Sequence, residues 1–420
     1  MKQASGRWYV GKHLYIVIIG FLLFYCYTLV SSGSTNVVIP LICGIRGWNE
    51  SLVLVGITIA GYVGALATLL FGWVVQKKGA KFVSSICMII AGVLLALWGV
   101  VQSMALFIVD TIVLTALAYG FQTASCPVLL GGWFPRKKGI VLGWATMGIV
   151  AVDITWSQFF PNLLGSIGIL AIFLGMGAIY IIIGILIATT VHNFPEEEGR
   201  FPDNIAEDAD KVREVGRQLA EYKTPYSFKK CAKTKQVWQI IFGWAMLIMV
   251  CVCFISRLVP RAMSLGYDLS FALKLLLISA ICGLFGSWFF GFIDQKFGTK
   301  KASIIYGIFT IVMLILCLLM PFGKAIVWIA SIGIVGGMGG IYNLLISINI
   351  QIFGRWDFVA TNRFVGFIQA ILVSSSFAIN AIFMNTSLGY TGLYSFLIIL
   401  AIVSLIIIIK TDDTMIGKKD

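Results

Sequence analysis

The chain has 420 residues, of which 59% are hydrophobic and 12% charged, with a formal net charge of +13 at pH 7 and a mean hydropathy of +0.97. Soluble globular domains are closer to half apolar and a quarter charged, so this composition excludes an ordinary soluble protein. The apolar residues form runs of roughly 18 to 28, the length that crosses ~30 Å of hydrocarbon as a helix. We therefore expect an all-α integral membrane protein.

About twelve apolar runs follow one another along the chain, and we read each as one membrane-spanning helix. The first follows a basic segment but lacks a small-residue cleavage site, so we expect a retained helix and not a signal peptide. The expected spans are 13–40, 52–75, 82–101, 106–130, 140–161, 167–191, 236–259, 269–293, 302–320, 325–352, 361–383 and 389–409.

Basic residues gather in alternate connections between these runs. They include Lys77, Lys78, Lys81, Arg136, Lys137, Lys138, Lys296, Lys300 and Lys301. The other connections hold little beyond Arg46, Arg261 and Lys324. Because basic loops stay in the cytoplasm, both termini are expected to be cytoplasmic, in the plasma or inner membrane. The positive charge thus indicates topology and not a nucleic-acid partner.

A short motif occurs twice, at the ends of the second and eighth runs, and it divides the chain into similar halves. Its matching positions are Gly72 and Gly291, Gln76 and Gln295, and Gly79 and Gly298. Such a repeat predicts two pseudo-symmetric six-helix bundles, at 1–192 and 236–420, with a site between them. The polar segment 193–235 would join them as a cytosolic loop. Within it, Val212, Val215 and Leu219 recur at helical spacing, which predicts a short amphipathic helix on the membrane surface.

Twelve spans in two halves, the repeated Gly-x-x-x-Gln-Lys-x-Gly loop and a long central loop resemble the major facilitator superfamily. The stretches 132–143, 258–266 and 352–355 resemble its oxalate/formate antiporter and monocarboxylate transporter branch. In the superfamily, an Asp–Arg contact at the repeated loop holds the bundles in one state. Here Gln76 and Gln295 occupy the Asp position, with Asp294 one residue away. The resemblance assigns conformational gating to both copies of this motif.

The resemblance also implies that spans one, four, seven and ten line a central cavity. The polar residues expected to bind substrate there or nearby are Tyr27, Ser31, Tyr119, Gln122, Arg257, Tyr342, Asn343 and Gln369. The alternative for most of them is a hydrogen bond between helices, worth about 0.6 kcal/mol on average. For Arg257, the alternative is a side chain that extends to the membrane interface.

Asp153 is the charged residue nearest the middle of the fifth span. A charge inside a span costs at least ~2.5–3.5 kcal/mol on insertion scales, so it calls for an explanation. Burial raises a carboxyl pKa toward the working pH, which would let the group couple proton flow to transport. The alternative is a structural hydrogen bond to a neighbouring helix.

Together these features predict a secondary transporter of a small organic anion, a monocarboxylate, driven by protons or by anion exchange. Its partners would be this substrate, protons and membrane lipids, and a monomer suffices for the architecture. The alternatives are an exporter of amphipathic or aromatic compounds and a membrane sensor that does not transport. No ATP-binding loop, metal ligand set or cofactor motif is found, and no catalytic arrangement predicts an enzyme.

Overall fold

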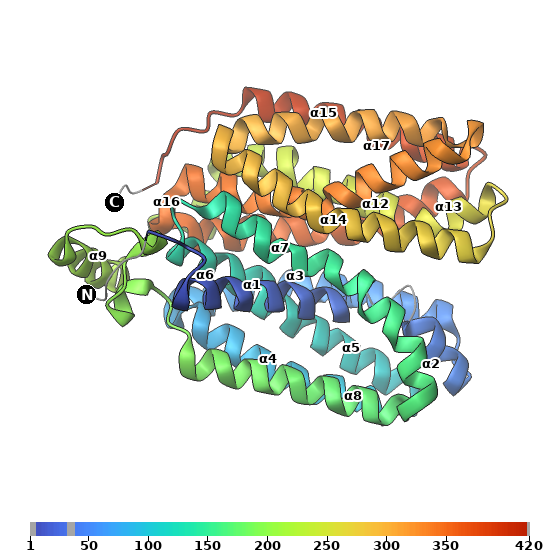
Figure 1. Cartoon of the computed structure of the whole chain (residues 1–420), viewed down its shortest axis with the longest axis horizontal. Coiled ribbons are helices and arrows are strands. Elements are labelled where there is room, and N and C mark those ends of the chain that lie inside the picture. The colour runs from blue at the N-terminus through green and yellow to red at the C-terminus, as the bar shows by residue number, and fades with distance from the viewer. Residues whose placement is uncertain (1–5, 32–37, 418–420) are drawn as a thin grey trace.

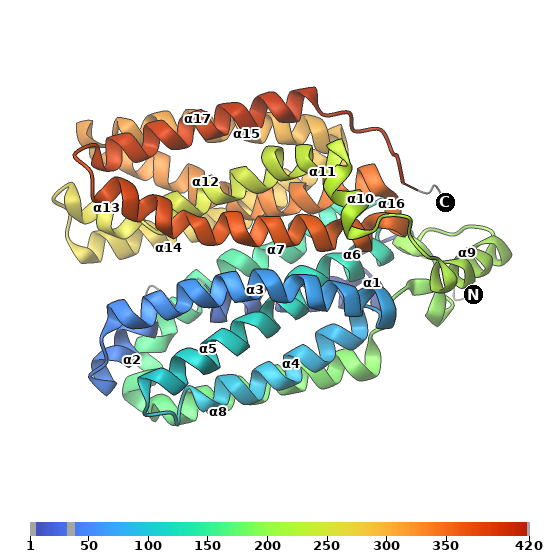
Figure 2. The ribbon, with the colours of Figure 1, turned by 180° about the vertical axis from the view of Figure 1, so that it is seen from behind.

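The computed structural model describes residues 6–31 and 38–417, and within these ranges every regular element is a helix. Figures 1 and 2 show the helices side by side along one axis in two stacked groups. Both chain termini and helix α9 (Ala209–Glu221) lie at the same end of this stack. We call it the terminal end, and the other the opposite end. The prediction of an all-helical fold is confirmed.

The first group contains the helices before residue 191. They are α1 (Gly11–Val30), α2 (Val38–Arg46), α3 (Glu50–Lys78), α4 (Ala80–Leu97), α5 (Met104–Tyr119), the π-helical turn η1 (Gly120–Ser125), α6 (Cys126–Trp133), α7 (Lys138–Ile154) and α8 (Trp156–Thr190). The segment that follows holds the short turns η2 (Pro195–Glu198) and η3 (Pro202–Asn204), then α9 and α10 (Phe228–Lys233).

The second group begins at Lys235. It comprises α11 (Lys235–Ile240), the π-helical turn η4 (Ile241–Ala245), α12 (Met246–Ile255), α13 (Leu258–Ser264), α14 (Leu269–Phe297), α15 (Thr299–Leu318), the turn η5 (Met320–Phe322), α16 (Lys324–Met384) and α17 (Gly389–Lys410). Each group has its own hydrophobic core, with Trp98 and Trp133 buried in the first and Trp244 and Tyr306 in the second. The limits 1–192 and 236–420 as separate bundles stay a prediction.

The described part of the chain supplies about twelve membrane crossings. Ten helical stretches are long and apolar enough to span a membrane. One of them, the 61-residue α16, is interrupted at Gly354 and therefore contains two crossings. The 17-residue α7 adds one more, since helix continues beyond it from Trp156. The protein is a multi-pass membrane protein.

Two bends correct the connections expected from the sequence. The turn after the fifth span falls at Gly168, with φ 77°, and not at 162–166. The tenth and eleventh spans are joined by a single non-helical residue, Gly354 with φ 65°, and 355–360 are helical where we expected a loop. Glycine adopts such positive φ values without the steric penalty of a side chain. The first span is also shorter than expected: α1 ends at Val30, and 32–37 lie outside the described residues.

The repeated motif folds in the same way in both halves. Gly79 ends α3 with φ 83° and Gly298 ends α14 with φ 86°. The N–H of each glycine donates to the carbonyl four residues earlier, at 2.9 Å in both copies. Because this conformation strains any residue with a Cβ, the second glycine of the motif is required by the turn itself.

The amphipathic helix expected in the central segment is present as α9. It extends beyond the helix bundles at the terminal end (Figure 1). Its Val212 is only 3% exposed, and a Cβ added at Gly216 would meet the Glu196 side chain at 2.7 Å. Part of its apolar face therefore packs on the protein, where we had expected the membrane surface.

Candidate functional site

Two small cavities, of about 20 and 10 Å³, lie between the two groups of helices. Both are lined by Gln122, Thr123, Tyr342 and Gln369, so we treat them as parts of one chamber. One water molecule needs roughly 10–15 Å³ of such volume. The chamber in this state is therefore too small for a substrate.

The chamber is polar but uncharged. Its hydroxyl groups come from Tyr27, Tyr119, Thr123 and Tyr342, and its amide groups from Gln122, Asn349, Asn362 and Gln369. The other lining residues are apolar or glycine, so no charged group of the described chain lines it. A ligand here would be recognised by neutral hydrogen-bonding groups and by aromatic surface.

Two tyrosines from the first group border the chamber together. The rings of Tyr27 and Tyr119 meet edge to face, with centroids 5.3 Å apart. A Cβ added at Gly64 of α3 would lie 2.5 Å from the Tyr119 ring, so only glycine leaves room for this ring position. Such edge-to-face pairs contribute about 0.5–1.5 kcal/mol beyond their buried area.

Gln122 and Thr123 reach the chamber from the π-helical turn η1. Pro127, just after this turn, has no N–H and cannot donate to the Thr123 carbonyl four residues earlier. That carbonyl instead accepts a hydrogen bond from Asn362 Nδ2 of α16, at 3.1 Å. A proline in the fourth span thus frees a backbone acceptor that joins the two groups of helices.

Five of the eight residues expected to bind substrate line the chamber: Tyr27, Tyr119, Gln122, Tyr342 and Gln369. Three do not. The Ser31 N–H donates to the Tyr27 carbonyl at 3.0 Å, at the end of α1. Arg257 precedes α13 at the opposite end. Asn343 is fully buried, and a Cβ added at Gly291 would meet its amide at 3.2 Å.

Three polar lining residues were missed from the sequence: Thr123, Asn349 and Asn362. Asn349 and Asn362 lie on either side of the bend at Gly354, which we had expected to be a longer loop. That expectation placed Asn362 at the very end of a span. A polar residue four positions before Pro127 was the available signal for Thr123.

The first copy of the repeated motif contacts the other group of helices at the terminal end. Arg363 NH1 of α16 donates to Gln76 Oε1 at 3.4 Å. The Arg363 side chain also fills the space beside Gly72, where an added Cβ would meet it at 2.6 Å. Gln76 therefore accepts from an arginine across the bundles, but over a long distance and without a charge of its own.

The second copy contacts α7 and the residues just before it. Gln295 Nε2 donates to the Arg136 carbonyl at 3.2 Å. Asp294 is 4% exposed and accepts a hydrogen bond from Thr299, and a Cβ added at Gly139 would lie 2.8 Å from its other oxygen. Gly291 lies against Gly143: a Cβ added at Gly291 would be 2.9 Å from the Cα of Gly143. The helices touch through backbone at this point.

A buried ion pair also closes the terminal end. Arg355, directly after the bend in α16, pairs with Glu196 of η2 at 2.9 Å, and each side chain is 3% exposed. Its NH2 group also donates to the Gly132 carbonyl at the end of α6, at 3.2 Å. The guanidinium lies 5.7 Å from the centre of the Phe194 ring. One arginine thus joins the second group to the first group and to the segment that follows it.

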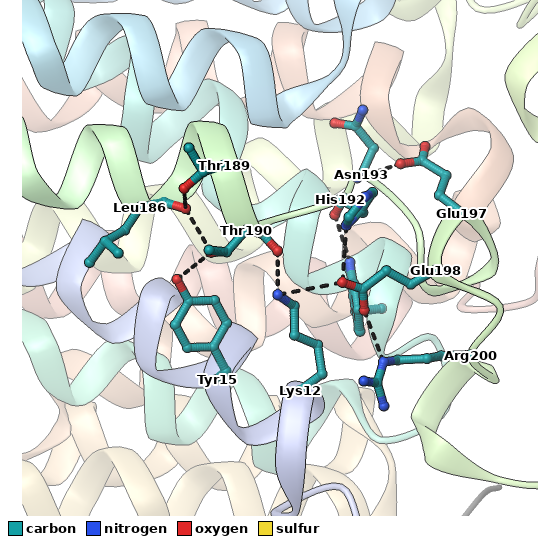
Figure 3. A network of polar contacts seen from close by, with 11 residues as sticks. Lys12, Tyr15, Leu186, Thr189, Thr190, His192, Asn193, Glu197, Glu198 and Arg200 are labelled. Atoms are coloured by element: carbon teal, nitrogen blue, oxygen red, sulfur yellow. Dashed lines mark hydrogen bonds and ion pairs between the residues drawn. The ribbon is translucent and has the colours of Figure 1, made fainter. Parts of the chain in front are cut away.

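The segment carrying Glu196 is fixed to the first group by a polar network (Figure 3). Glu198 lies at its centre and pairs with Lys12 at 3.5 Å, His192 at 3.2 Å and Arg200 at 2.9 Å. Burial would raise the pKa of Glu198, but the hydrogen bond from Arg200 and the charges of Lys12 and His192 outweigh it, so the pKa is lowered. The carboxylate therefore stays charged in this network.

A second anchor follows in η3. The Asp203 carboxylate accepts hydrogen bonds from the backbone N–H groups of Arg136 and Lys137, at 3.1 and 2.8 Å, before the first residue of α7. The far end of the connecting segment is held by the second group instead. There Tyr222 and Thr224 donate to Asp357 Oδ1 at 3.0 and 2.6 Å. The segment is thus tied to both groups.

Asp153 does not line the chamber. It lies near the end of α7, about midway through the helical stretch from Lys138 to the bend at Gly168. Val150, one helical turn earlier on the same face, packs on α14, where a Cβ added at Gly283 would meet it at 3.0 Å. Asp153 is therefore expected to face the boundary between the two groups.

About twelve apolar helices in two stacked groups, with a polar chamber between them, define a membrane protein of the transporter type. Residues 16–355 match the sequence profile of the Major Facilitator Superfamily. This covers more than half of the chain, and the protein belongs to that superfamily. The resemblance found in the sequence is confirmed.

Individual proteins support the same assignment. The chain is 25% identical over 272 residues to an oxalate:formate antiporter of Oxalobacter formigenes, covering 61% of this chain and 60% of that protein. The structure of the present chain is similar to that of the proton:xylose symporter XylE, with a TM-score of 0.72, 15% identity and 96% of both chains covered. The Escherichia coli fucose:proton symporter FucP gives 0.69 at 14% identity, covering 93% of this chain and 98% of that one. Both structures share the fold.

Proposed function

We propose that this protein is a secondary active transporter that moves a small organic anion, a monocarboxylate, by alternating access of its two helix bundles. The observation that carries the proposal is a polar, uncharged chamber between the bundles. The oxalate:formate antiporter named above also supports an organic anion as the substrate class.

The chamber suits one negative charge better than two. A hydrogen bond to a charged group contributes about 1.5–3 kcal/mol, so several neutral donors can hold a single carboxylate. Oxalate would bring a second charge, and no lysine or arginine of the described chain lines the chamber to balance it. Tyr27, Tyr119 and Tyr342 offer aromatic surface to the rest of a monocarboxylate.

The terminal end is the cytosolic side in this proposal, in the plasma or inner membrane. Exposed Lys77, Lys78 and Lys296 lie there, and basic loops remain cytoplasmic. The contacts of Gln76, Gln295 and Arg355 then close the cytosolic side of the chamber. Opening toward the cytosol would break them, and reforming them would return the chamber to the other side.

Coupling is assigned to Asp153 or to exchange against a second anion. A carboxyl group at the boundary between the bundles can bind a proton on one side and release it on the other as the bundles move. If exchange drives transport instead, a product anion would occupy the chamber on the return step.

Uptake into proteoliposomes tests the proposal against its alternatives. Purified protein would be assayed with radiolabelled formate, lactate, pyruvate, benzoate and oxalate, and with a cationic dye. Uptake of a monocarboxylate without dye transport supports the proposal. Dye movement without carboxylate uptake favours an exporter of aromatic compounds, for which the tyrosine pair would be the binding surface. Absence of both uptake and counterflow would instead indicate a sensor.

A further inference from the structure

Two amide side chains on opposite walls of the chamber share one arrangement. Thr123 Oγ1 donates a hydrogen bond to Gln122 Oε1 at 2.6 Å. Across the chamber, Thr361 Oγ1 lies 3.0 Å from Asn349 Oδ1. This is closer than the carbonyls of Phe358 and Asp357, at 3.2 and 3.4 Å, so we assign its single proton to Asn349. An amide carries its acceptor on the oxygen and its two donors on the nitrogen. A threonine that holds the oxygen therefore also decides where the N–H donors point.

In this arrangement the side-chain nitrogen of Asn349 has no acceptor for its N–H groups among the described residues. Asn349 lines the chamber and is only 1% exposed. A buried N–H without an acceptor is destabilising, so an acceptor that enters the chamber would be bound there. Each amide oxygen already accepts one hydrogen bond, so the groups that Gln122 and Asn349 offer the chamber are chiefly their N–H donors.

The two threonines are held by different parts of the protein. Thr361 and Asn349 both belong to α16, on either side of its bend. Thr123 is held from the opposite bundle: its carbonyl accepts from Asn362, and its methyl group would lie 3.1 Å from a Cβ added at Gly366. The orientation of Gln122 therefore depends on contact between the bundles, whereas that of Asn349 does not.

We infer that Thr123 and Thr361 determine the specificity of the chamber, by fixing the Gln122 and Asn349 amides as donors for a carboxylate. This rests on the proposed transport of a monocarboxylate. A carboxylate offers only acceptors and is selected, whereas the corresponding carboxamide brings N–H donors that meet donors. Separation of the bundles at the terminal end releases Thr123 from α16, so that Gln122 can turn and its contribution to carboxylate binding is lost on that side.

The test compares each carboxylate with its own amide. Lactate, pyruvate and benzoate are assayed for uptake into proteoliposomes, and lactamide, pyruvamide and benzamide for inhibition. The measured quantity is the ratio of the amide inhibition constant to the carboxylate KM. Thr123→Val and Thr361→Val keep the side-chain shape but lose the hydroxyl, and each should lower this ratio about tenfold, the loss expected for one hydrogen bond to a charged group. Thr→Ser at either position should restore it.

Matched controls separate this role from stability. Thr111 and Thr310 are buried threonines, one in each bundle, whose hydroxyls donate to the backbone carbonyls of Phe107 and Tyr306. Valine at these positions should leave the ratio unchanged. If a valine variant at 123 or 361 does not fold, Asn349→Asp, which keeps the side-chain oxygen and replaces the donor nitrogen by a second acceptor oxygen, should abolish carboxylate preference. A wild-type ratio in folded variants overturns the inference, whereas a wild type that takes up none of these three carboxylates and no formate overturns the proposed function itself.

Discussion

Replacing Arg355 by leucine should open the terminal end. Arg355 and Glu196 are 2.9 Å apart, and each side chain is 3% exposed. Removing one partner of a buried ion pair costs about 3–5 kcal/mol, because the other charge stays in a poorly solvated place. Opening of this end would bring water to Glu196, so the cost falls on the closed state. A shift of about 3 kcal/mol changes the ratio of closed to open molecules roughly 150-fold.

Distances between spin labels measure this change directly. Lys78 of α3 and Lys296 of α14 are exposed at the terminal ends of the two bundles and accept labels after substitution by cysteine in a background without the native cysteines. Arg355→Leu should move the distance distribution to longer values. The control is Arg217→Leu, because the pair of Arg217 with Glu214 has side chains 71% and 47% exposed. Exposed pairs contribute about 0–1 kcal/mol, so this control should change nothing.

The double variant Glu196→Leu/Arg355→Leu completes the experiment. Replacing both charges by apolar side chains also removes the carboxylate that lost its Arg355 partner, so the closed state should largely return. The reasoning would be refuted by an unchanged distance distribution in folded Arg355→Leu protein. It would equally be refuted by the same shift in Arg217→Leu.

Three further expectations concern single residues. Asp153→Asn should abolish gradient-driven accumulation of substrate in proteoliposomes while leaving exchange intact; normal accumulation would remove Asp153 from coupling. Gly291→Val should keep the terminal end open in the same label-distance measurement, because even a Cβ would meet the Gly139 carbonyl at 2.8 Å; wild-type distances would contradict this. Burial raises the pKa of Asp203 above its ordinary 3.8, although the hydrogen bonds from the backbone N–H groups act in the opposite direction. Protonated Asp203 therefore stabilises the folded protein fully below pH 3.8, and this stabilisation is lost as the pH rises through the pKa of the folded state. The melting temperature of the wild type should therefore fall relative to Asp203→Asn as the pH rises from 3.8, and a constant difference would refute it.

The spans were predictable because length and hydropathy are local properties of the chain. The glycine turn at Gly79 was visible for the same reason, since it recurs at Gly298. The bend at Gly354 was not. Arg355 and Asp357 looked like loop residues, because the groups that neutralise or bind them, Glu196 and the Tyr222–Thr224 stretch, come from a distant part of the sequence.

The chamber likewise contains residues that could be predicted from the sequence and residues that could not. Its tyrosines and glutamines stand out in apolar spans, and five of the expected residues meet there. Arg257 lies outside the chamber because it precedes α13 at the opposite end, the end of the seventh span where the sequence places it. Asn349 was missed because its significance depends on the hydroxyl of Thr361, which only the bend brings within reach.

The two ends of the connecting segment are fastened to different bundles, through Asp203 on one side and Asp357 on the other. Between them lies α9, whose 13 residues span about 20 Å as a helix but about 45 Å when unwound. If α9 unwound, the two groups of helices could separate by tens of ångströms while the hydrogen bonds of Asp203 and Asp357 stayed intact. Shortening this segment should therefore limit how far the two groups of helices can separate at the terminal end, although none of its described residues lines the chamber.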